Sequence, residues 1–149
     1  MNEVTVKSIM KLSEHFSLGE FTKTKHQTAD GNIPSHAVIE NLKRLCPWLE
    51  ELRRRYNEPI IINSGYRSPA VNKLAGGAKT SNHLTGCAVD IRCAGKEQMI
   101  RYASILLDIA DGTKQDYDEL LLEQHGSVCW LHFAVRPKDN RRKIEFLKS

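Results

Sequence analysis

Apolar positions with a helical period mark the region from Ser35 to about Tyr56. They recur at steps of three or four residues: Val38, Leu42, Leu45, Leu49 and Leu52. This spacing places them along one face of a helix that would pack against a core. Pro47 falls inside the stripe. Because proline cannot donate a backbone hydrogen bond, we expect it to kink or divide this helix.

Shorter apolar runs predict strands. The β-branched run over residues 59–63 is typical of a buried strand, and residues 88–91 predict a second one. Two more strands are expected over residues 117–123 and 129–135, joined by a tight connection around Gly126.

The remaining segments complete an α+β pattern. Residues 96–108 predict a second helix, and residues 12–21 a short docking turn in which Ser17 is a plausible N-cap. Residues 70–82 are rich in Gly, Ala, Asn and Ser, which suggests an irregular segment over a site. The grouping of strands and helices favours an α+β fold with a small, mostly antiparallel sheet flanked by helices.

Length and composition narrow the classes of protein. A chain of 149 residues is expected to form one domain, over residues 1–149, that buries its core without disulfides or a structural metal. Any metal site is therefore expected to be functional. The four cysteines form no Cys-x-x-Cys pair, so we expect reduced thiols rather than a zinc knuckle. Neither a secretory apolar segment nor a membrane-spanning stretch is present, which predicts synthesis in the cytoplasm.

The net charge of +4 suits an anionic polymer such as a cell wall, although the excess is small. The densest basic runs, at residues 53–55 and 141–143, are not interleaved with aromatic residues that could stack on bases. We interpret them as solvated faces. We therefore expect no nucleic-acid or membrane partner, and a monomer.

The segment from Ser81 to Asp90 carries the strongest chemical signal, with His83 and Asp90 on either side of a turn at Gly86. Asp90 follows apolar residues on a predicted strand, where a carboxylate is costly unless it is paired or bound to metal. His132 lies in another apolar run. Two imidazoles and one carboxylate would give zinc three ligands and leave a fourth position for water. Taken singly, a histidine in an apolar strand is more often a core residue, and an aspartate after a strand is commonly a cap.

The whole segment resembles the Ser-x-His-x-x-Gly-x-Ala-x-Asp motif of the zinc D-Ala-D-Ala carboxypeptidases and related phage endolysin peptidases, whose fold the Hedgehog signalling domain shares. The resemblance extends upstream through Ser64-Gly65-Tyr66-Arg67-Ser68 and downstream through Trp130-Leu131-His132. It covers nearly the whole chain, with three anchor motifs in the family's order. It implies a Hedgehog/DD-peptidase-like fold and a zinc-dependent metallopeptidase.

Carried over residue by residue, the resemblance makes His83, Asp90 and His132 the ligands of Zn²⁺. It also implies that the Arg67 guanidinium faces the scissile carbonyl and stabilises the oxyanion as charge develops. The alternative for Arg67 is a structural arginine that ties its turn to a carboxylate. Ser81 resembles a substrate-binding position, but a serine there could simply cap the turn.

The general base departs from the simplest family pattern. Many relatives carry an acidic residue three positions before the last histidine ligand, where this chain has Cys129. Other relatives place a glutamate at the end of the preceding apolar strand, and Glu123 fits that variant. It would take a proton from zinc-activated water and pass it to the leaving amine. Asp118 and Glu119 are the alternatives. His125 could stabilise the transition state or could be a solvated turn residue.

These observations favour a zinc metallopeptidase that hydrolyses peptide bonds of bacterial peptidoglycan, as a D-alanyl carboxypeptidase or an endopeptidase. The expected setting is a lysis enzyme of phage type that reaches the cell wall after release by a separate pore-forming protein. A cytoplasmic dipeptidase acting on free D-Ala-D-Ala ranks lower. Two other classes stay open: a catalytically inactive zinc-containing cell-wall-binding module, which the departure at Cys129 would permit, and a nucleic-acid-binding domain without stoichiometric zinc.

Overall fold

The predicted apolar stripe forms the long helix α3, His36–Tyr56, in a computed structural model that describes residues 9–149. Ser35 caps its first turn, where the side chain accepts a hydrogen bond from the Val38 backbone N–H at 3.3 Å. Pro47 was expected to kink or divide this helix; it lies inside α3 without dividing it, so the expectation of a division was wrong. The proline removes one backbone hydrogen bond, but Cys46, Trp48 and Leu49 around it are all buried, and their burial keeps the helix continuous.

Five strands form one sheet in the order β1-β2-β4-β3-β5. Their bounds are Ile62–Ser64 for β1, Ala88–Cys93 for β2, Glu119–His125 for β3, Val128–Ala134 for β4 and Lys143–Lys148 for β5. The β1–β2, β2–β4 and β3–β4 pairs are antiparallel, as expected for most of the sheet.

The sheet is nevertheless mixed, because β5 pairs with β3 in parallel. The sequence pattern did not indicate β5, whose side chains are all exposed or half-buried. The connection after β4 carries the chain back to the start of β3, where the Arg142 and Lys143 backbone N–H groups donate to the carbonyls of Tyr117 and Asp118 at 3.0 Å each. A strand that pairs in parallel with β3 must start at the same end of the sheet as β3, and this connection brings the chain back to that end.

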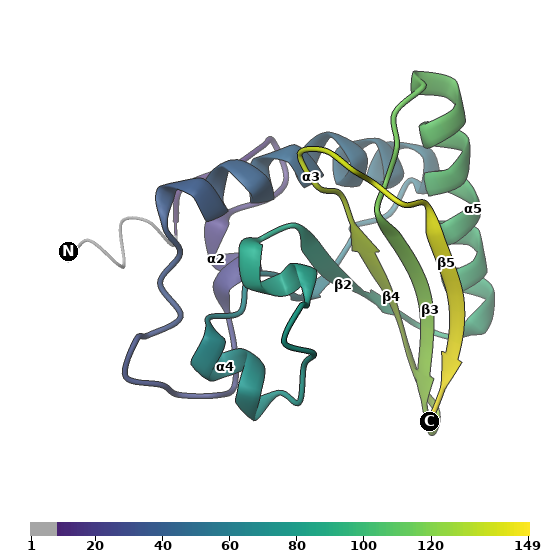
Figure 1. Cartoon of the computed structure of the whole chain (residues 1–149). Coiled ribbons are helices and arrows are strands. Elements are labelled where there is room, and N and C mark those ends of the chain that lie inside the picture. Colours follow the sequence, from purple (N-terminus) through teal and green to yellow (C-terminus); the bar gives the residue numbers. More distant parts are fainter. Residues whose placement is uncertain (1–8) are drawn as a thin grey trace.

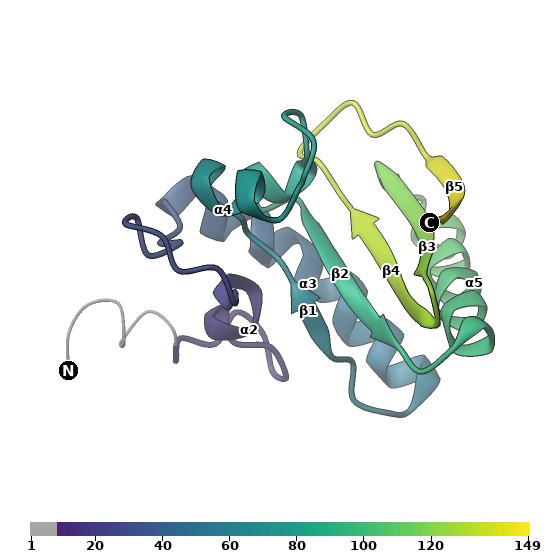
Figure 2. The ribbon, with the colours of Figure 1, turned by 90° about the horizontal axis from the view of Figure 1, so that it is seen from below.

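The two long helices, α3 and α5 (Lys96–Thr113), cover one face of the sheet, and the other face is left for the site (Figure 1, Figure 2). Side chains alternate between these faces along each strand. Leu120, Leu122, Leu131 and Phe133 belong to the buried core, and the Trp48 ring of α3 packs 5.2 Å from that of Phe133. The intervening positions of β3 and β4 point to the opposite face.

Three short elements flank the open face: α2 (Leu18–Thr22), α4 (Pro69–Leu74) and the 3₁₀ helix η1 (Asn82–Thr85). Ser17 is the N-cap of α2, as predicted. Residues 70–82 are not wholly irregular as expected, since α4 occupies their first part. Ser68 accepts a hydrogen bond from the Val71 backbone N–H at 3.2 Å, and Pro69 stands in the first turn, which together start a helix.

All four cysteines are buried free thiols, as expected. Within residues 9–149, none of the helices has the length and apolar character that crossing a bilayer requires.

Candidate metal centre

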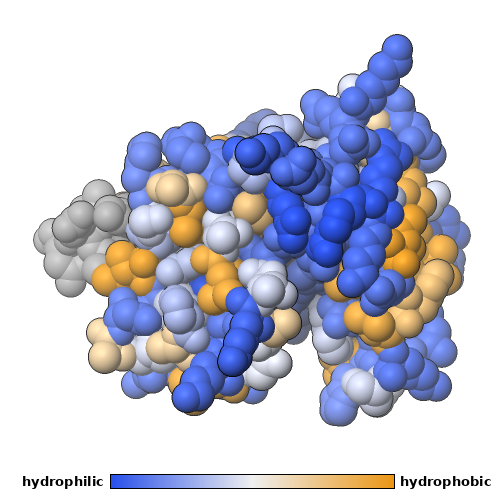
Figure 3. All heavy atoms as spheres, viewed as in Figure 1, coloured by the Kyte–Doolittle hydropathy of each residue, from blue (hydrophilic) through white to orange (hydrophobic). Residues whose placement is uncertain are grey.

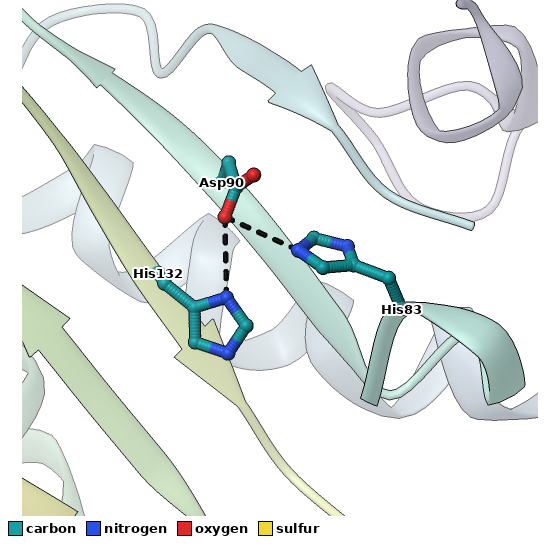
Figure 4. Close-up of side chains that lie close together, drawn as sticks. All are labelled: His83, Asp90 and His132. Carbon is teal, nitrogen blue, oxygen red and sulfur yellow. Dashed lines mark hydrogen bonds and ion pairs between the residues drawn. The ribbon is translucent and has the colours of Figure 1, made fainter. Parts of the chain in front are cut away.

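Three buried side chains converge on the open face of the sheet: His83, Asp90 and His132 (Figure 4). The Asp90 Oδ1 atom lies 3.2 Å from His83 Nε2 and 3.2 Å from His132 Nδ1. One ligand atom from each residue lies within 4.8 Å of the other two. The sequence analysis nominated these three residues together, and the fold brings them together.

Local structure explains this convergence. His83 lies in η1, and Gly86 ends η1 with a left-handed backbone (φ 76°) that turns the chain into β2. A side chain at Gly86 would place its Cβ 2.8 Å from the Val38 carbonyl oxygen of α3, so only glycine fits the turn. Asp90 and His132 are direct partners in the antiparallel β2–β4 ladder. Residues that oppose each other in such a ladder have neighbouring side chains on one face.

The outer nitrogen of each imidazole is held by the protein. His83 Nδ1 lies 2.6 Å from the Gly65 carbonyl oxygen, and His132 Nε2 lies 3.0 Å from Glu119 Oε1. Because a carbonyl and a carboxylate are acceptors, these nitrogens carry the protons. The other nitrogens, His83 Nε2 and His132 Nδ1, are thereby directed towards Asp90. In the neutral form of each ring these nitrogens carry the lone pair that would bind a metal. Metal-binding histidines are oriented in the same way.

The charges of the cluster are strongly coupled. Burial on its own would raise the pKa of Asp90, but His83 and His132 outweigh it and hold the pKa well below its usual range. Burial would lower the pKa of His132, but Asp90 and Glu119 raise it to about 9. Without a metal, His132 is therefore protonated at neutral pH. Its two ring N–H groups then bond to the carboxylates of Asp90 and Glu119.

The donor set fits zinc. Ligand atoms about 2.0–2.1 Å from a tetrahedral zinc are about 3.3 Å from one another, close to the two 3.2 Å separations at Asp90 Oδ1. Two nitrogens and one carboxylate oxygen are also the donors of many catalytic zinc sites, which keep a fourth position open. His83, Asp90 and His132 could hold such an ion.

Arg67 borders this cluster. Its Nη2 lies 3.2 Å from Asp90 Oδ2 and its Nε donates to Ser64 Oγ at 3.2 Å. The guanidinium thus points at the cluster of His83, Asp90 and His132, and its partner there is the Asp90 carboxylate. Ser81 caps η1 by accepting a hydrogen bond from the His83 backbone N–H at 3.1 Å. Its capping role is visible, and a contact with substrate stays a prediction.

Glu123 lies on β3 opposite Trp130 of β4, and its Oε2 accepts a hydrogen bond from the indole Nε1 at 3.0 Å. Burial, and then the negative charge of Asp90, raise the pKa of this carboxyl. A half-buried glutamate with a raised pKa beside a candidate metal site is a candidate general base.

Glu119 and Asp118, the alternative bases, have other partners. Glu119 Oε1 bonds to His132 and also accepts a hydrogen bond from Asn82 Nδ2 at 2.6 Å. Both partners lower the pKa of Glu119, and His132 has the larger effect. Asp118 is fully buried, and its carboxylate accepts from Asn82 at 2.8 Å and from the Arg141 guanidinium at 3.0 and 2.8 Å. Both carboxylates are therefore engaged in holding the site.

Sequence reasoning missed Asn82 and Arg141. Asn82 is a neighbour of His83, so its position in the motif could have indicated a role. Arg141 belongs to a basic run that we interpreted as a solvated face. It is exposed, as that interpretation expects, but it also ion-pairs with the fully buried Asp118, which the interpretation did not foresee. His125 is exposed at the end of β3, where its ring bonds to Ser149 Oγ at 3.0 Å. Cys129 is buried as a free thiol.

A family model described as peptidase M15 matches residues 14–117, which is more than half of the chain. The matched residues include Arg67, His83 and Asp90. They end before Glu123 and His132, whose association with the cluster comes from the fold. A search of curated proteins finds no match.

Proposed function

Because the chain belongs to the peptidase M15 family, the family of the zinc D-Ala-D-Ala carboxypeptidases, we propose that it hydrolyses peptide bonds of bacterial peptidoglycan. The observation that carries the proposal is the convergence of His83, Asp90 and His132 with their outer polar atoms already bonded. Such a cluster is prepared to bind a metal and leaves one side open to water and substrate.

The residues around the cluster supply the remaining chemistry. A zinc ion held there would polarise a water molecule and the scissile carbonyl. Glu123 takes a proton from the attacking water and delivers it to the leaving amine, a task suited to a carboxyl whose pKa is raised by burial. Arg67 turns from Asp90 towards the carbonyl oxygen and stabilises its developing negative charge. Glu119 keeps His132 oriented throughout.

A catalytically inactive wall-binding module is the second candidate. It would use the same three ligands, and the buried Cys129 in place of an acidic residue favours it. The two candidates differ in what Glu123 does, since a binding module has no use for a general base.

The test is digestion of purified peptidoglycan by the zinc-loaded protein, with mass analysis of the fragments. Free D-alanine would identify carboxypeptidase action, and split cross-links would identify an endopeptidase. In the Glu123→Gln variant we expect turnover to fall about 10²–10⁴-fold, with one zinc per chain retained.

Glu97→Gln, an exposed α5 position, provides the matched control and should leave turnover unchanged. An intact wall in the presence of stoichiometric zinc would favour the binding module instead. Absence of zinc from the wild-type protein would remove the basis of both candidates.

A further inference from the structure

A cavity of about 660 Å³ lies beside the metal cluster. Ser64 and Arg67 line it, and both adjoin the candidate metal site: Arg67 bonds to Asp90, and Ser64 pairs with Asp90 in the β1–β2 ladder. Residues 23–26, which follow α2, also belong to its lining. The cavity therefore continues the open side of the cluster. Figure 3 shows that the surface is also hollowed between the side that carries α4 and the side that carries β5.

The charge of this cavity has one sign. Its charged lining residues, Lys23, Lys25 and Arg67, are all basic, and the lining contains no acidic residue. Within residues 9–149, neither Lys23 nor Lys25 takes part in an ion pair, whereas Arg67 is paired with Asp90. Two exposed lysines in one concave surface, unpaired among the residues that the structure describes, attract an anion more strongly than scattered lysines do.

The opposite side of the cluster carries both signs of charge. Glu119 and Glu123 lie on β3, on the same face as His132, and Glu119 Oε2 lies 3.5 Å from the Arg141 guanidinium. The cavity side differs from it, because its exposed lysines have no carboxylate partner among residues 9–149.

Part of the cavity lining is apolar. Val71, Leu74 and Ala75 of the α4 region contribute to it, together with the buried Tyr66. Short aliphatic side chains of a peptide could pack against these residues in the same cavity that the lysines line.

We propose that this cavity binds a carboxylate of the substrate, and that Lys23 and Lys25 are the residues that select for it. The inference rests on the proposed function, because it assigns one part of the same substrate to one side of the metal cluster. A wall peptide offers two sources of that carboxylate: the free C-terminus of the residue that leaves, or a carboxylate elsewhere on the peptide chain. The first would make the protein an exopeptidase, and the second is compatible with cleavage inside a cross-link.

The experiment measures peptide binding and peptide hydrolysis separately. Zinc-loaded protein is titrated with three forms of one short wall-type peptide: with all carboxylates free, with only the C-terminus amidated, and with only the internal carboxylates amidated. Calorimetry on the Glu123→Gln variant gives affinity without turnover, and the wild-type protein gives kcat and KM. The Lys23→Gln/Lys25→Gln variant is compared with Lys73→Gln, a change at an exposed α4 lysine outside the lining.

We expect amidation of one source to weaken binding about five- to tenfold, as is typical of one or two exposed ion pairs. The double lysine variant should bind all three forms about equally, with KM raised and kcat little changed. The preference should shrink at high ionic strength. Lys73→Gln should behave as wild type.

Binding that ignores amidation, a preference that survives the double lysine change, or failure of every peptide to bind would each overturn the inference. If wild type hydrolyses the peptides without such a preference, the proposed function stands and the inference falls. If carboxylate-dependent binding occurs without hydrolysis, the inference stands and the peptidase activity falls.

Discussion

At the scale of single residues, the site depends on hydrogen bonds that the two histidines make on the side away from the proposed metal position. His83 is held by the Gly65 carbonyl and His132 by Glu119, so neither ring has to be reoriented when a metal binds. Glu123 is held differently, by one indole N–H from Trp130. That bond opposes the effect of burial, which raises the pKa of Glu123.

Replacing Trp130 with phenylalanine should shift the pH dependence of activity. Loss of the indole donor removes a bond that stabilises the charged carboxylate, so the pKa of Glu123 rises further. A general base works only when deprotonated. The acidic limb of the kcat/KM profile should therefore move to higher pH, while zinc content stays at one per chain. A limb that stays in place or moves to lower pH would show that Glu123 is not the titrating base.

At the scale of elements, α2 packs against the turn after β1 through a backbone contact. The contact is so close that residue 65 must be a glycine. The Tyr66 backbone N–H donates to the Phe21 carbonyl at 2.7 Å, and a Cβ on Gly65 would lie 2.6 Å from the same oxygen. The contact also fixes the Gly65 carbonyl that binds His83. One glycine thus connects the packing of α2 with the orientation of a proposed metal ligand.

Gly65→Ala should therefore cost both stability and metal affinity. Because the colliding atoms are backbone, relief requires α2 to move, and we expect a loss of about 1–3 kcal/mol in the free energy of unfolding. Zinc affinity should fall as well, since the carbonyl moves away from His83. Urea unfolding and chelator competition measure the two effects. Gly112→Ala in α5, where a Cβ would meet nothing within 4 Å, is the control and should be neutral or slightly stabilising.

At the scale of the whole molecule, the three proposed ligands join segments that are distant along the chain. η1, β2 and β4 approach one another only in the folded state, so a metal that binds all three binds the folded chain alone. Such binding stabilises the fold by mass action. In the metal-free state a proton on His132, whose pKa is about 9, occupies the same cluster, and metal must displace it.

Zinc should consequently raise the melting temperature in a pH-dependent way. Free zinc at a hundred times its Kd adds about 2.7 kcal/mol, which corresponds to roughly 5–10 °C for a chain of this size. At fixed free zinc the shift should grow between pH 6.5 and 8.5, because the competing proton becomes easier to remove as the pH approaches about 9. Scanning calorimetry in a zinc buffer measures it. A shift independent of pH, or equally large in His132→Ala, would contradict this assignment.

The sequence by itself determined features that depend on neighbouring residues. The period of apolar residues fixed α3, and the apolar run before Asp90 fixed β2. The spacing of motifs indicated the family, which the family model confirms, and it nominated the three proposed ligands.

The tertiary structure decided what depends on strand register. Glu119 and Glu123 are four residues apart on β3, so the alternation of side chains places both on the same face. The sequence pattern alone could not decide which of them is the general base. The pairing of β3 with β4 sets Glu123 opposite Trp130, and Glu119 bonds to His132. The parallel strand β5, the burial of Asp118 under Arg141 and the basic cavity beside Arg67 likewise arise from contacts between distant segments. Local patterns do not encode such contacts, because they depend on how the whole chain packs.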